Sequence, residues 1–374
     1  MDTIVECSIL YSKQDWDAHE TSWDFQTNEI VGLDTYDKYV NTIHEIYEGT
    51  GIMALLETPR LESLEWRTEI IKQKWEDKFM RLHDNEEELN RQFIEIYGLQ
   101  DELTPDVPLK EITILQQGEI SIEKVQNSNS LEAMTSETIQ WHDDVLMKQL
   151  ISYAVGCMMG RYSIDKPGLI LANKGDGQKE YEALVPDSRF EIDDDGIIPL
   201  MPANTEFTDN ITRRFNRWLS TTFGENSLVD NLNYMERSLG KRLDDYFGKE
   251  FWKDHKKMYQ NRPIYWLFSS KKGAFQCIVY MHRMNAYTVE KVRTGYLLPH
   301  IEWLIAKQNE MQANADNLST RERREMDNIG KQIEECREYH ERLHVVADKQ
   351  TNLDLDDGVV VNHAKFGDVL VKLK

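Results

Sequence analysis

KEFWKDHKKMYQNRPIYWLFSSKKGAFQCIVYMHRM, from Lys249 to Met284, combines cationic side chains, aromatic residues and a proline break in one short stretch. The pattern up to Gln260 is helical, and the Arg262–Pro263 step favours extended backbone, so a helix should end there. Residues 264–268 are β-branched, aliphatic or aromatic, Gly273 supplies a turn, and apolar residues alternate beyond it. We therefore expect a helix followed by a two-stranded hairpin with lysines at its tip.

The charge of this stretch opposes that of the whole chain. Lys plus Arg number 44 against 66 for Asp plus Glu, a formal net charge of −22. A chain this acidic is repelled by nucleic acid and by anionic membranes unless its cations gather in one place. Phosphate contacts supply most of the sequence-independent affinity for nucleic acid, so a gathered cationic face could bind DNA. The candidate DNA-binding residues are Lys253, Lys256, Lys257, Arg262, Lys271 and Lys272, with a smaller cluster of Arg213, Arg214 and Arg217.

A structural interpretation of the same residues stays open. The lysines can form a solvated helix face and a loop tip without any ligand. Trp252, Tyr265 and Trp266 are more often core residues than platforms on which bases stack.

Length and composition limit the class of protein. With 374 residues and 40% hydrophobic content, the chain can bury a sizeable core in one extended unit or two compact ones. Its cysteines, at positions 7, 157, 277 and 336, lack metal-ligand or redox spacing, which favours a reducing cytoplasm. No basic leader precedes an apolar core, and no uncharged run approaches membrane-spanning length. We expect a cytoplasmic protein without a membrane partner.

Helical periodicity dominates the remaining chain. The expected helices are 61–97, with a candidate break near 83–85, then 138–162, 207–223, 228–239, and an αα-hairpin of 299–315 and 320–346. Ser319 and Glu322 form a capping-box signature for the last helix. In that helix Met326, Ile329, Ile333, Cys336, His340 and Leu343 follow a heptad spacing. The predicted fold class is mainly α, multi-helical, with a long αα-hairpin near the C-terminus and a small β-hairpin element.

Other segments lack a helical period. Residues 1–33 are expected to be irregular, 112–122 to form a weak hairpin, 166–196 to be mobile, and 359–361 to be extended. Residues 126–136 are Ser/Asn-rich and form the best linker. The predicted organisation is therefore an N-terminal helical segment (1–125), a linker (126–136), a helical core with the basic helix and β-hairpin (137–298), and the αα-hairpin with a C-terminal tail (299–374).

Motifs for bond chemistry are weak. Residues 340–344 spell HExxH, a zinc-binding pattern, but His340 falls on the predicted packing seam and no third ligand follows at the usual spacing. Residues 193–196 resemble half a calcium loop, yet Pro202 stands where the closing glutamate is required, so we expect a solvated acidic turn. No phosphate-binding loop or dinucleotide fingerprint occurs. The sequence therefore predicts no catalytic, cofactor-binding or metal-binding residue.

Several stretches together resemble the C-terminal portion of PglX, the adenine-specific DNA methyltransferase of BREX phage-defence systems, and more loosely the tails of restriction-modification methyltransferases. They are DWD (15–17), ETSWDF (20–25), NEEELN (85–90), IYGL (96–99), ISYAVGC (151–157), GRY (160–162), RPIYWLF (262–268), YMHR (280–283) and DDGV (356–359). The stretches span nearly the whole chain in the expected order. The family's S-adenosylmethionine-binding loop and its Asn-Pro-Pro-Tyr-type catalytic tetrad have no counterpart among them.

The resemblance implies a helical region that follows the target-recognition module, as a split gene product or an expressed fragment. Such a chain would be inactive alone, with S-adenosyl-L-methionine bound elsewhere in the parent enzyme. Its implied partners are double-stranded DNA in the assembled enzyme, the methyltransferase and target-recognition portion of the same enzyme, and other BREX proteins. A base-flipping enzyme must clamp the flanking duplex, which is the role expected of the lysines and arginines. The alternative is an autonomous partner-binding helical scaffold, with residues 299–346 as the docking element and no DNA role.

Overall fold

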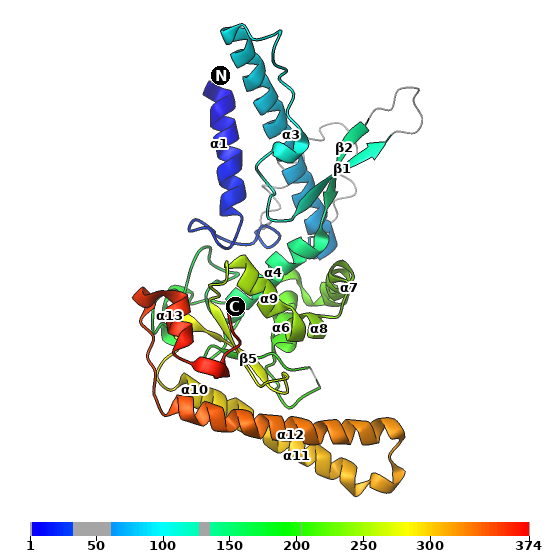
Figure 1. The fold of residues 1–374 in the computed structure, drawn as a ribbon, viewed down its shortest axis with the longest axis vertical. Helices are drawn as coiled ribbons and strands as arrows, with labels where there is room; N and C mark the ends of the chain where they lie inside the picture. Colours follow the sequence, from blue (N-terminus) through cyan, green and yellow to red (C-terminus); the bar gives the residue numbers. More distant parts are fainter. Residues whose placement is uncertain (1, 33–60, 127–134, 203, 374) are drawn as a thin grey trace. The chain divides into compact units, whose positions relative to one another are not determined.

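The computed structural model describes residues 2–32, 61–126, 135–202 and 204–373 (Figure 1). The chain divides into two compact units, the first comprising Met1–Tyr153 and Thr222–Gly240, the second Ala154–Thr221 and Lys241–Lys374. Helix α4 (Asp143–Met158) begins in the first unit and ends in the second. These units differ from the segments expected from the sequence. Most of the expected linker, residues 127–134, lies outside the described residues, and a domain boundary there stays a prediction.

The first unit is organised around one long helix. Its elements are α1 (Asp2–Asp17), α3 (Leu64–Tyr97), β1 (Ile120–Gln126), β2 (Thr135–Trp141), the start of α4, and α7 (Leu228–Leu239). Helix α3 begins at Ser63, whose side chain accepts from the backbone N–H of Trp66, and ends at Gly98, whose φ of 67° suits glycine. The helix is continuous through 83–85, and Ile71, Trp75 and Phe79 are among its buried residues.

Three expectations for the first unit are wrong. Residues 1–33 contain helix α1, which lies beside α3 but buries none of its own residues, so no apolar period marks it in the sequence (Figure 1). The weak hairpin expected within 112–122 does not form. Instead β1 pairs antiparallel with β2, from Ile120↔Trp141 to Gln126↔Thr135. The start of the expected helix 138–162 is therefore strand, and α4 begins at Asp143.

The second unit is built on a small buried sheet. Strands β4 (Tyr265–Ser269) and β5 (Gln276–Tyr280) form the expected hairpin, with Tyr265 opposite Tyr280 and Ser269 opposite Gln276. A third strand, β3 (Ile197–Pro199), pairs with β5 and gives the order β3-β5-β4. Sequence periodicity missed β3 because three buried residues are too few to show alternation.

The second unit also contains several short helices. They are α5 (Gln178–Leu184), α6 (Ile211–Phe223), α8 (Leu243–Lys249), α9 (Phe251–Met258), α10 (Thr288–Lys291) and α13 (Gly358–Ala364), with a π-helical turn at Val292–Leu297. The C-terminal residues 359–361, expected to be extended, lie in α13. Residues 166–196, expected to be mobile, contain α5 and bury Tyr181, Phe190 and Ile192.

The αα-hairpin consists of α11 (Leu298–Ala313) and α12 (Thr320–Ala347), which lie side by side (Figure 1). Four of the predicted seam residues, Ile329, Ile333, Cys336 and Leu343, are buried, whereas His340 is only partly buried and Tyr339 beside it is fully buried. The described part of the chain has a mainly α fold with a small β-hairpin, as predicted, and its strands form two small antiparallel sheets. None of its helices is both long and apolar enough to cross a membrane.

The capping box of α12 gives a first test. The Ser319 hydroxyl accepts from the Glu322 N–H, and the Glu322 carboxylate accepts from the Ser319 N–H. We expect Ser319→Ala to lower the free energy of unfolding by about 1 kcal/mol, because one end of this reciprocal pair is lost. Ser319→Asp, which keeps a capping oxygen, should retain stability in urea unfolding. Equal stability of the alanine and aspartate variants would contradict this role.

Candidate functional site

Helix α9 presents cations on one face and buries the other. Phe251, Trp252 and His255 are buried, and the Trp252 Nε1–H donates to the Tyr265 carbonyl at 3.1 Å. Lys253 and Lys257 are exposed, and neither makes an ion pair within the described residues. The spacing follows helical geometry, since positions three or four apart share a face. The third lysine of α9, Lys256, is held over the Trp252 ring, 5.3 Å from its centroid.

The turn after α9 is set by unusual backbone geometry. Gln260 and Asn261 both have positive φ, 51° and 61°, which costs energy in residues other than glycine. Buried His255 offsets this cost, because its Nε2 accepts from the N–H groups of Ile264 and Tyr265, each at 3.2 Å. The turn leaves Arg262 exposed, and the chain enters β4 at once.

The tip lysines form a separate group. Lys271 and Lys272 are exposed at the turn that follows β4, whereas Arg262 precedes the strand. The ends of a five-residue strand lie about 13 Å apart at ~3.3 Å per residue. The tip is fixed by Glu335 of α12, whose Oε1 accepts from the Ser270 hydroxyl at 2.6 Å, the Lys272 N–H at 2.6 Å and the Ala274 N–H at 3.2 Å. The structure therefore divides the predicted basic stretch into two groups.

The arginines of α6 have partners within the protein. Arg214 pairs with the Asp193 carboxylate at 2.8 Å, Arg217 pairs with Glu191 at 2.8 Å, and Arg213 donates to the Phe207 carbonyl at 3.1 Å. Arg213 and Arg217 remain exposed, but Arg214 is only partly so.

Asp193 is not part of a solvated acidic turn, contrary to expectation. It is 2% exposed, and its Oδ1 accepts from the N–H groups of Asp195, Gly196 and Ile197. Burial raises the pKa of this carboxyl, although Arg214 acts in the opposite direction. The carboxylate has a structural role, because it organises the loop that enters β3. Among the described residues, no group of three or more His, Cys, Asp or Glu could hold a metal ion.

The cluster around Arg161 was not predicted by motif or charge analysis. Arg161 follows the end of α4, where Gly160 has a φ of 78°. Its Nε donates to the Tyr162 hydroxyl at 3.1 Å and its Nη1 to the Tyr280 hydroxyl at 3.2 Å. Its guanidinium carbon lies 5.3 Å from the centroid of the Tyr162 ring. Tyr280 in turn donates to the Leu171 carbonyl at 2.6 Å.

Histidine and tyrosine side chains complete the Arg161 cluster. The His255 ring centroid lies 4.7 Å from that of Tyr259 and 4.6 Å from that of Tyr265, both of which interact electrostatically with Arg161. Burial, followed by the charge of Arg161, lowers the pKa of His255 to about 3 and that of His282 to about 4. Both imidazoles are therefore neutral at pH 7, and the guanidinium supplies the positive charge of the cluster.

The Arg161 cluster brings together stretches that are far apart in the sequence. Gly160-Arg161-Tyr162, the Arg262–Phe268 stretch and the Tyr280–Arg283 stretch, on which the resemblance partly rests, each contribute a side chain. The sequence signal that could have indicated the cluster was that all three stretches belong to the resemblance. Its meaning depends on the contact of Arg161, after the end of α4, with Tyr280 of β5, which no local pattern specifies.

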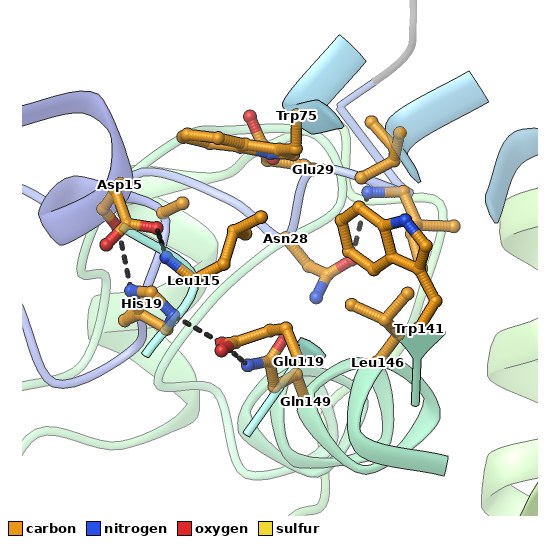
Figure 2. A pocket seen from close by; sticks show the side chains of 13 residues that line it. Asp15, His19, Asn28, Glu29, Trp75, Leu115, Glu119, Trp141, Leu146 and Gln149 are labelled. Carbon is orange, nitrogen blue, oxygen red and sulfur yellow. Dashed lines mark hydrogen bonds and ion pairs between the residues drawn. The ribbon is translucent and has the colours of Figure 1, made fainter. Parts of the chain in front are cut away.

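A pocket in the first unit has a different character (Figure 2). It is lined by His19, Trp75, Trp141 and other residues, and its volume of about 40 Å³ is sufficient to hold water. The His19 ring nitrogens contact the Asp15 carbonyl and the Glu119 carboxylate, each at 2.7 Å, and the Gln149 amide donates to Glu119 at 2.8 Å. This His19–Glu119 network is internally satisfied, whereas buried Trp141 Nε1, which also lines the pocket, has no partner among the described residues.

Comparison with known proteins adds an independent finding. No family model matches the chain. It is 34% identical over 410 residues to the adenine-specific methyltransferase BrxX of Escherichia coli O9:H4 (strain HS), covering 100% of this chain and 30% of that protein. The resemblance to PglX-type methyltransferases is confirmed. The chain is also 34% identical over 381 residues to the adenine-specific methyltransferase PglX of Lacticaseibacillus casei (strain Zhang), and this match covers 97% of the chain and 27% of that protein.

The chain thus spans about 30% of the length of the curated relatives it matches. That share is consistent with a C-terminal region of a PglX-type protein.

Glu335 gives a test of how the tip lysines are positioned. Glu335→Ala removes the acceptor shared by the Lys272 and Ala274 N–H groups, so we expect faster hydrogen exchange at both and a stability loss of about 1 kcal/mol. Glu334→Ala, at an exposed neighbour, should change stability by less than about 0.5 kcal/mol. Unchanged exchange at the tip in Glu335→Ala would refute the role.

Glu335 should also contribute to the pH dependence of stability. Burial alone would raise the pKa of this carboxyl, but the hydrogen bonds from Ser270, Lys272 and Ala274 outweigh burial and lower it. Its contribution is therefore present above the ordinary value of 4.5 and lost as pH falls through the lowered pKa. Acid unfolding followed by circular dichroism should show a weaker acid dependence in Glu335→Ala.

The His19–Glu119 pair predicts pH dependence in the opposite range. Burial alone would lower the pKa of His19, but Glu119 outweighs burial and raises it. The contribution of His19 is full below its ordinary value of 6.5 and lost as pH rises through the raised pKa. We expect Glu119→Gln to cost about 1–3 kcal/mol at pH 6 and less at pH 9, measured by urea unfolding. Exposed Glu123→Gln is the control, and a pH-independent loss in Glu119→Gln would contradict the assignment.

Proposed function

We propose that this chain is the C-terminal helical region of a PglX-like adenine-specific DNA methyltransferase of a BREX anti-phage defence system. In this proposal it assists DNA engagement, target recognition and complex assembly, and has no catalytic group of its own. S-adenosyl-L-methionine binds in another part of the parent enzyme. The proposal is supported by similarity along the whole chain to two adenine-specific methyltransferases of greater length.

The observation that carries the DNA role is the exposed cationic face of α9 and its turn, formed by Lys253, Lys257 and Arg262. Each is exposed and makes no ion pair within the described part of the chain, although acidic side chains greatly outnumber basic ones overall. Cations left unpaired in so acidic a protein are available to phosphate. The buried opposite face of α9 and the two hydrogen bonds that His255 accepts hold this surface in place.

The expected mode of binding is contact with the DNA backbone. Lysine and arginine contacts to phosphate position a protein on duplex DNA without reading its sequence. Lys271 and Lys272 provide a second contact region at the opposite end of β4, and Lys256 lies at the edge of the first. Arg213 and Arg217 are exposed and can contribute to the proposed surface, but both already have partners within the protein. The pairing of Arg214 with Asp193 favours a structural role.

The proposed partners are double-stranded DNA, the methyltransferase and target-recognition portion of the same enzyme, and other BREX proteins. The competing proposal is a helical scaffold that docks a protein through α11 and α12 without binding DNA. The outer end of this hairpin, residues 320–328, is almost entirely exposed and supplies such a surface.

The DNA role is tested by charge reversal at Lys253, Lys257 and Arg262 together. We expect weaker binding to duplex DNA and a log–log salt slope that is shallower by about 0.9 for each phosphate that the variant no longer neutralises. Fluorescence anisotropy between low and moderate salt measures both, with the chain alone and with the methyltransferase portion present. Charge reversal at Lys110, Lys331 and Lys349 together is the matched control, because it also reverses three charges and all three lysines are exposed on other surfaces. Equal effects of the two variants, or no DNA binding in either setting, would favour the scaffold.

A further inference from the structure

We propose that Arg161 and the tyrosines around it form a binding site for a phosphate-type oxyanion. This site is distinct from the exposed lysines of α9, and the inference does not require the DNA role proposed above. The ligand could be the phosphate group of a small molecule or a backbone phosphate of DNA, since both present the same oxygen atoms.

The first argument is a positive charge without an acidic partner. Several other partly buried cations of the second unit contact carboxylates, as Arg214 does with Asp193 at 2.8 Å and Arg293 with Glu290 at 2.7 Å. Arg161 is only partly exposed, and within the described residues it makes no ion pair. Partial burial of a charge is costly unless another group compensates it. In a chain with a net charge of −22, phenol rings in place of a carboxylate leave the charge of this guanidinium for an external anion to balance.

The second argument is the unused donor capacity of the guanidinium. Arginine has five N–H donors in a planar fork that matches carboxylate and phosphate oxygens. Arg161 donates to Tyr162 through Nε and to Tyr280 through Nη1, so donors on Nη1 and Nη2 remain without a partner among the described residues. These lie on the edge of the fork that binds an oxyanion through two parallel hydrogen bonds.

The third argument comes from the neighbouring histidines. The Nε2 atom of His255 accepts two backbone N–H bonds, so the proton of its neutral ring lies on Nδ1. That Nδ1 is buried and has no partner among the described residues, and the same holds for Nδ1 of His282. Both rings lie close enough to Arg161 for its charge to act on them. Unpaired buried polar atoms beside an uncompensated cation are the features expected of a ligand site.

The fourth argument is that the side chains are held in place before any ligand binds. A Cβ added at Gly156 would collide with the Tyr162 ring, so the ring packs directly on the glycine. The Arg161 N–H donates to the Gly156 carbonyl at 2.8 Å, and the Arg161 carbonyl accepts from the Ile170 N–H at 2.9 Å. The Tyr280 hydroxyl is fixed by Leu171. A preorganised site loses little conformational entropy on binding, which favours affinity.

The experiment titrates the chain with inorganic phosphate at constant ionic strength, with chloride as the reference anion. Isothermal titration calorimetry measures affinity, and NMR of the imidazole groups reports on His255 and His282. We expect saturable phosphate binding with shifts of both imidazoles. Arg161→Met should weaken binding by about tenfold or more, because a charged hydrogen-bond donor is removed. Arg161→Lys should weaken it less, since it keeps the charge but not the fork, and Lys349→Glu should leave it unchanged.

Further variants and measurements distinguish a folding defect from loss of the site, and identify the source of the phosphate. Tyr280→Phe removes one hydroxyl that positions Arg161 and should weaken phosphate binding even if Arg161→Met fails to fold, which circular dichroism would reveal. If the source is a DNA phosphate, inorganic phosphate competes with duplex DNA and Arg161→Lys lowers DNA affinity; if it is a small-molecule phosphate, DNA affinity stays unchanged. Absence of saturable phosphate binding, or equal binding by wild type and a folded Arg161→Met, would overturn the site. The Lys253, Lys257 and Arg262 variant tests the DNA role separately.

Discussion

The imidazole of His255 makes the pair of hydrogen bonds on which the second unit depends. Its Nε2 receives the N–H groups of Ile264 and Tyr265, and so ties the end of α9 to the first residues of β4. Burial lowers the pKa of His255 to about 3, so the ring keeps its acceptor over the physiological pH range. The connection between helix and strand therefore does not change with pH near neutrality.

Both candidate sites of the second unit follow from this connection. On the outside, it holds Gln260 and Asn261 in left-handed geometry and leaves Arg262 exposed beside the lysines of α9. On the inside, it places the rings of Tyr259 and Tyr265 against His255, near Arg161. One buried side chain thus positions an exposed cationic surface for DNA and a partly enclosed cation for an oxyanion.

The distribution of charge explains why the two groups differ in character. The exposed lysines are well hydrated, so each contributes little alone and several must act together on a phosphate backbone. Arg161 sits among phenol rings, where water is scarcer and each hydrogen bond to an anion is stronger. The tip lysines, which Glu335 positions, lie at a distance from the cationic surface of α9. The paired arginines of α6 could extend that surface only by giving up existing contacts.

The sequence by itself determined α9, the break at Pro263, the β4–β5 hairpin and the α11–α12 hairpin, because each rests on local periodicity, capping or turn chemistry. It also determined the resemblance to PglX-type methyltransferases. Helix α1 was not predicted because it buries no side chain. Strand β3 was not predicted because it is only three residues long. Only the tertiary structure decided that Arg161 meets Tyr280, 119 positions away, and that the lysines form two groups. Packing of the end of α4 against β4 and β5 brings such residues together, and short-range pattern does not encode that packing.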